Sequence, residues 1–362
     1  MSASRFLPTS PARARLAVAA ALALAAAAAH AGRPHYVIVD LGVVGSTATA
    51  SQAVGVSPNG RIAVGRDLDT TSFPAVSWTR EGGAVALPNL AGRSFAQANG
   101  VNDAGVAVGT STTTAFGSGA LPVMWSGGAV TALPLPAGQN VGRAWAINAA
   151  GVAAGSIGSD IFERGAIYAP EGTSLITTTT PGGRYMTEAY GITDGGLVAG
   201  NGVDPDNAAL NVALVYDRSV DTMTDIGALP GDNSALAFGI SNAGYVVGSS
   251  MIYQGSGMPY VWSPAAGMVA IPLPPETETG SGRAVNDRGW VVGNAGGLYS
   301  VPFLYAGGRT YALWQLVPKN SGWDLRTNTS ASAEGVTDAG TIVGTAVHDG
   351  ETHAYAMFLR GH

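Results

Sequence analysis

Apolar and polar residues follow one short pattern that recurs along the chain. Its clearest copy reads A-N-G-V-N-D-A-G-V-A-V-G over Ala98–Gly109. An apolar strand is followed by a four-residue polar turn that ends on glycine, and then by a second apolar strand that also ends on glycine. The pattern predicts seven β-hairpins, at Ala53–Gly65, Ala98–Gly109, Ala144–Gly155, Ala189–Gly200, Ala237–Gly248, Gly282–Gly293 and Ala333–Gly344.

The hairpins are evenly spaced. Their turn glycines, from Gly60 to Gly340, are 45, 46, 45, 48, 45 and 51 residues apart, and a fixed period of this size indicates a solenoid, a propeller or an array. Each period holds two further strands, such as Leu121–Trp125 and Ala129–Leu133 in the second. Four short strands in about 45 residues predict an all-β, seven-bladed β-propeller with four antiparallel strands per blade. Each third strand ends on an aromatic residue that we expect to be structural: Trp78, Trp125, Tyr168, Tyr216, Trp262, Tyr305 and Phe358.

The two ends of the chain are expected to complete the last blade. After Phe358 too few residues remain for a fourth strand, whereas His35–Leu41 has the pattern of a fourth strand and precedes the first repeat. Pairing of His35–Leu41 with Ala354–Phe358 would leave no exposed sheet edge. An open solenoid is the alternative, and it predicts no such pairing.

Small residues place the first strand of each repeat next to the axis, and acidic residues recur in the turns. One position in that strand is always small, which lets blade backbones converge: Gly55, Gly100, Ala146, Gly191, Gly239, Ala284 and Gly335. The turn acids Asp103, Asp194, Asp287 and Asp338 are expected to bond to turn backbone, not to bind Ca²⁺ or to catalyse.

Composition and charge exclude several classes of function. Gly is 52 of 362 residues and charged residues are only 12%, which suits a turn-rich β protein. Without the first 31 residues the chain keeps 15 basic against 24 acidic residues. We therefore expect neither nucleic acid nor an anionic membrane as a partner. Cysteine is absent from the sequence, which leaves no disulfide, thiol nucleophile or thiolate metal site.

The first 31 residues have the pattern of a signal peptide. Arg5, Arg13 and Arg15 precede an apolar run from Leu16 to Ala29, and Ala29-His30-Ala31 forms a cleavage pattern of small residues. The run is short for a membrane span, which needs about 20 apolar residues. We predict export to the periplasm or the extracellular medium, with residues 32–362 forming a single propeller domain.

Several strings resemble the bacterial HAF repeat, a family named for a His-Ala-Phe tripeptide. They are GVNDAGVAVG, GVTDAGTIVG, the segment Met223–Gly231 and His353-Ala354-Tyr355. Most third strands depart from the tripeptide, as in Met258-Pro259-Tyr260 and Val301-Pro302-Phe303. The resemblance implies a repeat architecture and export, and it supplies no activity and no catalytic residues.

Binding residues are expected on the face that carries the variable loops. In a propeller these loops join second to third strands and successive blades, whereas the tight turns lie on the opposite face. Five arginines in the blade-to-blade segments could form a ring that holds an anionic group. The alternative is that each pairs with a nearby acid or caps a loop carbonyl. These arginines are Arg93, Arg143, Arg184, Arg283 and Arg326.

Trp323 is the preferred single binding candidate, because it lies with Asp324 and Arg326 in the longest of these segments. Trp314 is expected in a fourth strand, Thr310–Leu316, within the core. The segment His348–His353 (HDGETH) contains two histidines and two acids, but an Asp-Gly hairpin turn explains its centre and places the histidines on the surface. A metal needs three or four converging ligands, so no metal site and no cofactor are predicted.

The sequence therefore favours a non-enzymatic, monomeric binding module for an unidentified protein or glycan, acting through one face. The alternative is an exported enzyme, a glycan hydrolase or lyase, at the mouth of the central channel. Two carboxylates roughly 5–10 Å apart in that mouth would favour the enzyme.

Overall fold

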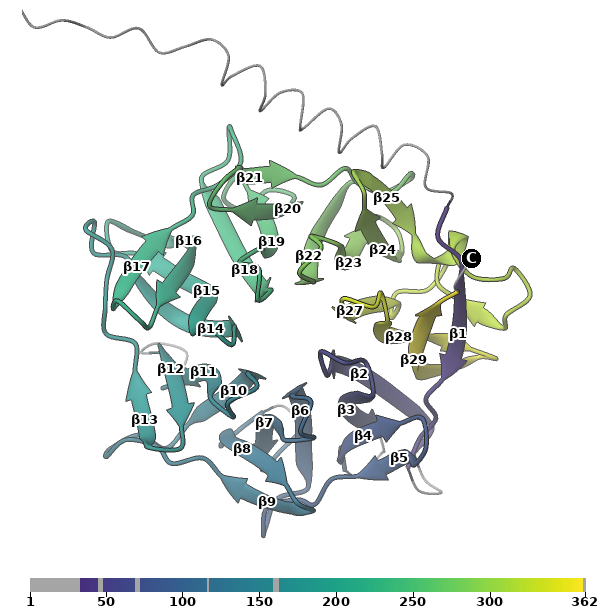
Figure 1. The fold of residues 1–362 in the computed structure, drawn as a ribbon, viewed down its shortest axis with the longest axis horizontal. Coiled ribbons are helices and arrows are strands. Elements are labelled where there is room, and N and C mark those ends of the chain that lie inside the picture. The colour runs from purple at the N-terminus through teal and green to yellow at the C-terminus, as the bar shows by residue number, and fades with distance from the viewer. Residues whose placement is uncertain (1–32, 45–47, 69–71, 116, 159–162, 361–362) are drawn as a thin grey trace, which may run out of the picture.

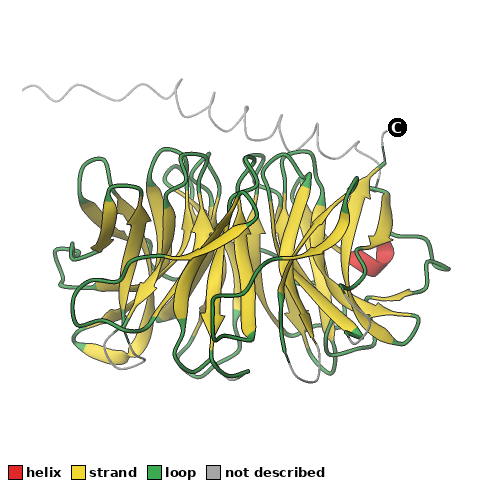
Figure 2. Cartoon of the chain, turned by 90° about the horizontal axis from the view of Figure 1, so that it is seen from below, coloured by secondary structure: helices red, strands yellow, loops and turns green. Residues whose placement is uncertain are grey.

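The computed structural model describes residues 33–44, 48–68, 72–115, 117–158 and 163–360. In this part the chain forms seven antiparallel sheets arranged as blades around one axis (Figure 1). Seen from the side the molecule is a flat disc (Figure 2). The predicted seven-bladed β-propeller is thus confirmed. The predicted leader, residues 1–31, lies outside the described residues, and no helix within them is long and apolar enough to cross a membrane.

Six blades are each formed by one continuous stretch of chain, with the first strand innermost (Figure 1). Blade one contains β2 (Ala50–Val56), β3 (Ile62–Leu68), β4 (Ala75–Thr79) and β5 (Gly83–Ala86). Blade two contains β6 (Phe95–Val101), β7 (Ala107–Thr112), β8 (Leu121–Ser126) and β9 (Ala129–Ala132). Blade three contains β10 (Gly142–Ile147), β11 (Ala153–Ile157), β12 (Arg164–Ala169) and β13 (Gly172–Leu175).

The next three blades repeat this order. Blade four contains β14 (Tyr185–Ile192), β15 (Leu197–Asp204), β16 (Asn207–Asp217) and β17 (Thr222–Asp225). Blade five contains β18 (Ser234–Ile240), β19 (Val246–Met251), β20 (Met258–Ser263) and β21 (Gly267–Ala270). Blade six contains β22 (Thr279–Val285), β23 (Val291–Gly296), β24 (Ser300–Ala306) and β25 (Arg309–Ala312).

Blade seven is built from both ends of the chain, as predicted. Its strands are β27 (Ser332–Val336), β28 (Ile342–His348), β29 (Glu351–Leu359) and the N-terminal strand β1 (Tyr36–Asp40). β1 pairs antiparallel with β29 from Tyr36 opposite Leu359 to Asp40 opposite Tyr355. A short strand, β26 (Trp323–Asp324), pairs with the outer end of β28 and gives this sheet a fifth member.

The hydrophobic core is divided among the blade interfaces. Seven clusters of buried apolar side chains each join two neighbouring blades, and one of them joins blade seven to blade one through Val343, Ala356 and Trp78. Of the third-strand aromatics, Trp78, Trp125 and Tyr168 are buried. The other four are half-buried at the edges of the same clusters. These rings are structural, as the sequence indicated.

Every inner hairpin contains one β-bulge at the same place. The register of the first two strands shifts in blade one between Ala53 and Gly55, and at the equivalent position in the other six blades. The glycine that ends each repeat lies opposite this bulge. A Cβ at Gly65 would be 1.8 Å from the carbonyl oxygen of Gln52, and the other six glycines are equally close to theirs. Close approach of the backbone therefore explains the second glycine of the pattern.

The tight turns are joined to one another around the opposite face. Asp287 Oδ1 accepts a hydrogen bond from Ala243 N at 2.7 Å, and Asp338 Oδ1 accepts one from Asp287 N at 2.8 Å. The turn acids do bond to turn backbone, but the turn belongs to the preceding blade. Similar side-chain bonds link every consecutive pair of blades from the first to the seventh.

One expected strand is shorter than the pattern suggested. β25 ends at Ala312, and the single 3-10 turn η1 (Leu313–Gln315) follows where Thr310–Leu316 was expected to continue as a strand. Leu313 and Leu316 are buried, and Leu316 O accepts a hydrogen bond from Tyr36 N. The chain leaves the sheet here because these leucines pack into the core beside β1.

Candidate functional site in the central cavity

A cavity of about 610 Å³ lies on the axis and is lined by the inner strands of all seven blades. Its volume falls in the range of small-molecule sites, roughly 300–1,000 Å³. The walls come from β2, β6, β10, β14, β18, β22 and β27, which are held by the interface clusters on either side. A ligand here would therefore meet a rigid frame.

The bulge determines which side chains enter the cavity. A bulge re-aims the extra residue of a strand, and the bulged residue of each blade lines the cavity. In blade order these residues are Val54, Asn99, Trp145, Tyr190, Phe238, Arg283 and Glu334. The ring is chemically divided, with aromatic side chains in blades three to five and charged or amide side chains in blades six, seven and two.

The aromatic arc consists of Trp145, Tyr190 and Phe238. The Trp145 and Tyr190 ring centroids are 5.3 Å apart with a tilt of 32°, and Tyr190 meets Phe238 edge to face at 5.9 Å. All three rings are half-buried. The Trp145 indole Nε1 is buried and has no hydrogen-bond partner among the described residues. The arc thus offers a continuous apolar surface to the cavity.

A charged pair continues the ring. The Arg283 guanidinium lies 4.9 Å from the centre of the Phe238 ring, and its Nε is 3.6 Å from Glu334 Oε2. That Nε is buried and has no hydrogen-bond partner in the described part of the chain. Glu334 Oε1 accepts a hydrogen bond from Asn294 Nδ2 at 3.0 Å. Both charges are therefore held in place by the ion pair, and Glu334 is also held by Asn294.

Amides and a second arginine complete the polar arc in blades one and two. Arg66, on β3, donates from Nε to Gln52 Oε1 at 3.0 Å and stacks over Phe73. Gln97 donates to Asn99 Oδ1 at 2.8 Å. The four polar side chains line the cavity together. They provide fixed donors and acceptors opposite the aromatic arc.

Burial shifts the pKa values of Tyr190 and Arg66 in the cavity wall. It raises the pKa of Tyr190 well above its ordinary value, and the neighbouring Glu188 carboxylate, hydrogen-bonded to it, raises it further. Burial also lowers the pKa of Arg66, which starts from so high a value that the guanidinium stays charged. Tyr190 is therefore a neutral hydroxyl and not a base.

The two ends of the cavity differ. The position after the small inner residue is aliphatic in every blade and lies next to the tight turns: Val56, Val101, Ile147, Ile192, Ile240, Val285 and Val336. Gln52, Gln97 and Ser332 precede the bulges, so they lie toward the face with the variable loops. Polar groups thus face the loop side, from which a polar ligand would enter.

The structure does not bring the five predicted arginines together. Arg283 alone lines the central cavity. Arg93 donates to the carbonyl oxygens of Ser111 and Gly119, which is the loop-capping alternative. Arg143 pairs with Glu163 at 3.4 Å, and Arg184 pairs with Asp204 and Asp225.

The predicted group around Trp323 is not among the described residues that line the central cavity. Trp323 is half-buried in β26 and packs against the cluster between blades six and seven. Asp324 accepts hydrogen bonds from the Arg326 and Thr327 backbone, and Arg326 pairs with Glu276 and stacks over Trp314. A ligand-binding role for these residues stays a prediction.

The residues of the aromatic arc were not among those chosen from the sequence. Trp145, Tyr190 and Phe238 occupy the middle position of a repeated segment of two small residues, A-W-A, A-Y-G and A-F-G, which otherwise reads as an ordinary strand. That position carries seven different residues in seven repeats, between neighbours that hardly change. This variation inside a strand was the available signal, whereas variation was sought only in loops.

Comparison with known proteins gives structural relatives only. No protein-family model and no curated protein sequence matches the chain. Similar solved structures include an oligogalacturonate lyase in complex with manganese, with a TM-score of 0.56, 10% identity, and coverage of 91% of this chain and 99% of that one. Another is YCF48 bound to a D1 peptide, with a TM-score of 0.51, 8% identity, and coverage of 91% and 100%.

A prolyl endopeptidase is also similar, with a TM-score of 0.53 and 11% identity over 86% of this chain. The match spans only 46% of that enzyme, so this chain corresponds to about half of its length. At such identities the likeness shows the propeller fold alone. The fold is shared by enzymes and by binding proteins.

Proposed function

We propose that this chain is an exported, non-enzymatic binding protein that holds part of a glycan in the central cavity. The single observation that carries the proposal is the divided ring of bulged side chains. Trp145, Tyr190 and Phe238 form one wall, and Arg283 and Glu334 begin the other. The export and the relation to HAF-repeat proteins rest on the sequence patterns given above.

A sugar ring has the two kinds of surface that this cavity complements. Its C–H faces stack on aromatic rings, and its hydroxyls donate and accept hydrogen bonds at the edges. The polar arc contains three amides, two guanidinium groups and one carboxylate, which offer both donors and acceptors.

The enzymatic alternative has less support from this geometry. Among the described residues that line the cavity, Glu334 is the only carboxylate, and none is a histidine. Glycoside hydrolysis ordinarily requires two carboxyl groups. Glu334 is already engaged by Arg283 and Asn294, and Tyr190 is protonated. A binding role uses these groups as they stand.

The test is a screen of oligosaccharides followed by affinity measurements on two matched variants. Trp145→Ala removes an aromatic wall, and we expect it to weaken binding tenfold or more. Tyr253→Ala removes an exposed aromatic ring from the loop between β19 and β20, and we expect no change. Melting curves of both variants exclude unfolding as the cause.

Two results would overturn the proposal. One is a bound glycan whose affinity responds to Tyr253→Ala or Arg93→Ala but not to Trp145→Ala, because the loops would then carry the site. The other is turnover of a bound oligosaccharide that is lost in Glu334→Gln, which would establish the enzymatic alternative.

A further inference from the structure

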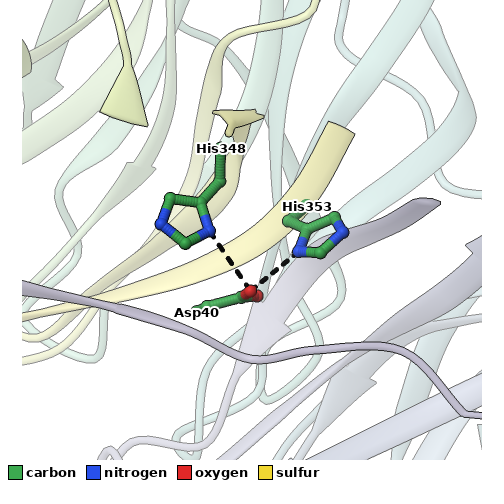
Figure 3. A group of neighbouring side chains, drawn as sticks. All are labelled: Asp40, His348 and His353. Carbon is green, nitrogen blue, oxygen red and sulfur yellow. Dashed lines mark hydrogen bonds and ion pairs between the residues drawn. The ribbon is translucent and has the colours of Figure 1, made fainter. Parts of the chain in front are cut away.

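Three side chains with metal-binding atoms meet at the seam of the ring. Asp40 comes from β1, His348 from the end of β28 and His353 from β29 (Figure 3). One ligand atom from each lies within 4.8 Å of the other two. Asp40 is more than 300 residues from both histidines in sequence, and ring closure brings it to them.

The atoms converge on one point. His353 Nδ1 is 2.8 Å from Asp40 Oδ2, and His348 Nδ1 is 3.4 Å from the same oxygen (Figure 3). The other carboxylate oxygen, Asp40 Oδ1, accepts a hydrogen bond from Gly42 N at 2.8 Å. That bond fixes the carboxylate so that Oδ2 faces both imidazoles.

Surrounding groups hold the histidines in this orientation. The Trp323 ring stacks on His348 with centroids 4.4 Å apart and a tilt of 16°, and its edge meets the buried ring of Tyr355. Asp349 and Gly350 form the hairpin turn between β28 and β29, both with positive φ. Asp349 Oδ2 is 3.8 Å from His348 Nε2, on the side of the ring away from Asp40. Metal-bound histidines commonly have such an outer partner.

The donor set selects a class of metal. Two imidazole nitrogens and one carboxylate oxygen suit divalent first-row transition ions, whereas Ca²⁺ and Mg²⁺ prefer all-oxygen ligands. The three side chains are 20 to 30% exposed, so the site is reachable and has room for water as a further ligand. Asp349, next to His348, adds a negative charge beside the site.

We propose that Asp40, His348 and His353 form a binding site for a divalent transition-metal ion of the Zn²⁺ class that fastens β1 to blade seven. The two histidines belong to one hairpin, and Asp40 belongs to the strand that this hairpin captures. An ion bound to all three therefore requires the closed ring, and its binding free energy adds to the stability of closure. This inference is independent of the proposed function, because the site lies outside the central cavity.

The experiment uses untagged protein freed of metal with a chelator. Titration calorimetry with Zn²⁺ is expected to show one site per chain with a dissociation constant in the micromolar range or below, and Zn²⁺ is expected to raise the melting temperature. His348→Ala, His353→Ala and Asp40→Asn should each weaken binding tenfold or more. His35→Ala is the matched control, since His35 is exposed and directly precedes β1, and it should leave binding unchanged.

A second measurement needs no variant. Co²⁺ added to the metal-free wild type should give the visible absorption bands of four- or five-coordination, and Zn²⁺ should abolish them. The proposal is overturned if the wild type shows no saturable binding. It is also overturned if His348→Ala and His353→Ala, folded by their melting curves in chelator, bind Zn²⁺ as tightly as the wild type. In either case the three groups form only a charge-assisted hydrogen-bond set.

Discussion

Blade seven and the other six blades reach the same architecture by different means. In blades one to six each strand pairs with the strand that follows it in the chain, so pairing is local. In blade seven the fourth strand is β1, which precedes every other strand in the chain and pairs with β29 from the opposite end. Closure of the ring therefore depends on the pairing of β1 with β29.

The contacts at the seam differ accordingly. Side chains of the tight turns link consecutive blades from the first to the seventh, but within the described residues none of these links joins blade seven to blade one. The seam has bonds of its own instead. Ser51 Oγ accepts a hydrogen bond from Ala354 N at 2.9 Å, and Asp67 Oδ2 accepts one from Val44 N. Stability at the seam therefore depends on a few specific groups and on the docking of β1.

Removal of β1 should produce the largest effect. Deleting residues 33–42 exposes the edge of β29 along five paired residues and removes the buried Tyr36. We expect aggregation or a fall in melting temperature on the order of 10 °C or more. Deleting only residues 33–34, which precede the pairing, is the control. An unchanged melting curve for the longer deletion would mean that the ring does not need its fourth strand.

Alanine substitution of Trp78 and of Trp125 compares the interface at the seam with an interface between two ordinary blades. Trp78 lies in the cluster between blades seven and one, and Trp125 lies between blades one and two. Replacement of either by alanine should cost about 3–5 kcal/mol in the free energy of unfolding, measured by denaturant titration. A cost below about 1 kcal/mol would show that the ring is not buried as described.

Replacement of the same two tryptophans by phenylalanine is expected to have a different cost at each position, because their indole N–H groups differ in hydrogen bonding. Trp125 Nε1 donates to Pro88 O at 2.8 Å, whereas Trp78 Nε1 is buried without a partner in the described structure. Trp125→Phe should therefore cost about 1 kcal/mol more than Trp78→Phe, because only the first loses a hydrogen bond. Equal costs would contradict this assignment of the indole contacts.

The fold followed from the sequence because the repeats are local and numerous. Seven copies of one hairpin pattern reveal the period, the strand order and the small inner residues, and the match of His35–Leu41 to a fourth strand predicts closure. The prediction of a strand over Thr310–Leu316 was wrong beyond Ala312, because packing of Leu313 and Leu316 into the core outweighs the local strand pattern.

The candidate sites were less predictable, because they depend on convergence. The bulge that turns Trp145 and Tyr190 into the cavity is a shift in register, and the glycine opposite it does not by itself reveal which side chain is turned inward. Asp40 joins His348 and His353 only through ring closure, so the local sequence of the β28–β29 hairpin does not reveal that three ligands converge. The arginines chosen for planarity and position mostly pair with nearby acids or carbonyl groups, which sequence spacing does not reveal.

The smallest expected effect concerns a single charge at the seam. Asp67 is fully buried, and its Oδ1 has no hydrogen-bond partner among the described residues. Burial raises the pKa of Asp67 to about 6, although the Val44 N–H and the charge of His353 partly offset the shift. Because the folded-state pKa exceeds the unfolded value, the contribution of Asp67 to the free energy of unfolding favours the folded state at low pH and is lost as the pH rises from about 4 to about 6.

Asp67→Asn removes the buried charge and keeps an acceptor for Val44. We expect it to raise the free energy of unfolding by roughly 1–3 kcal/mol at pH 8 and to give no gain at pH 4, in denaturant titrations with chelator present. Asp217→Asn in blade four is the control with the opposite sign, since hydrogen bonds from Ser219 lower the pKa of Asp217 and its charge favours folding above the unfolded pKa. If Asp67→Asn has the same effect at both pH values, the carboxylate is not desolvated, and the seam depends on its hydrogen bond alone.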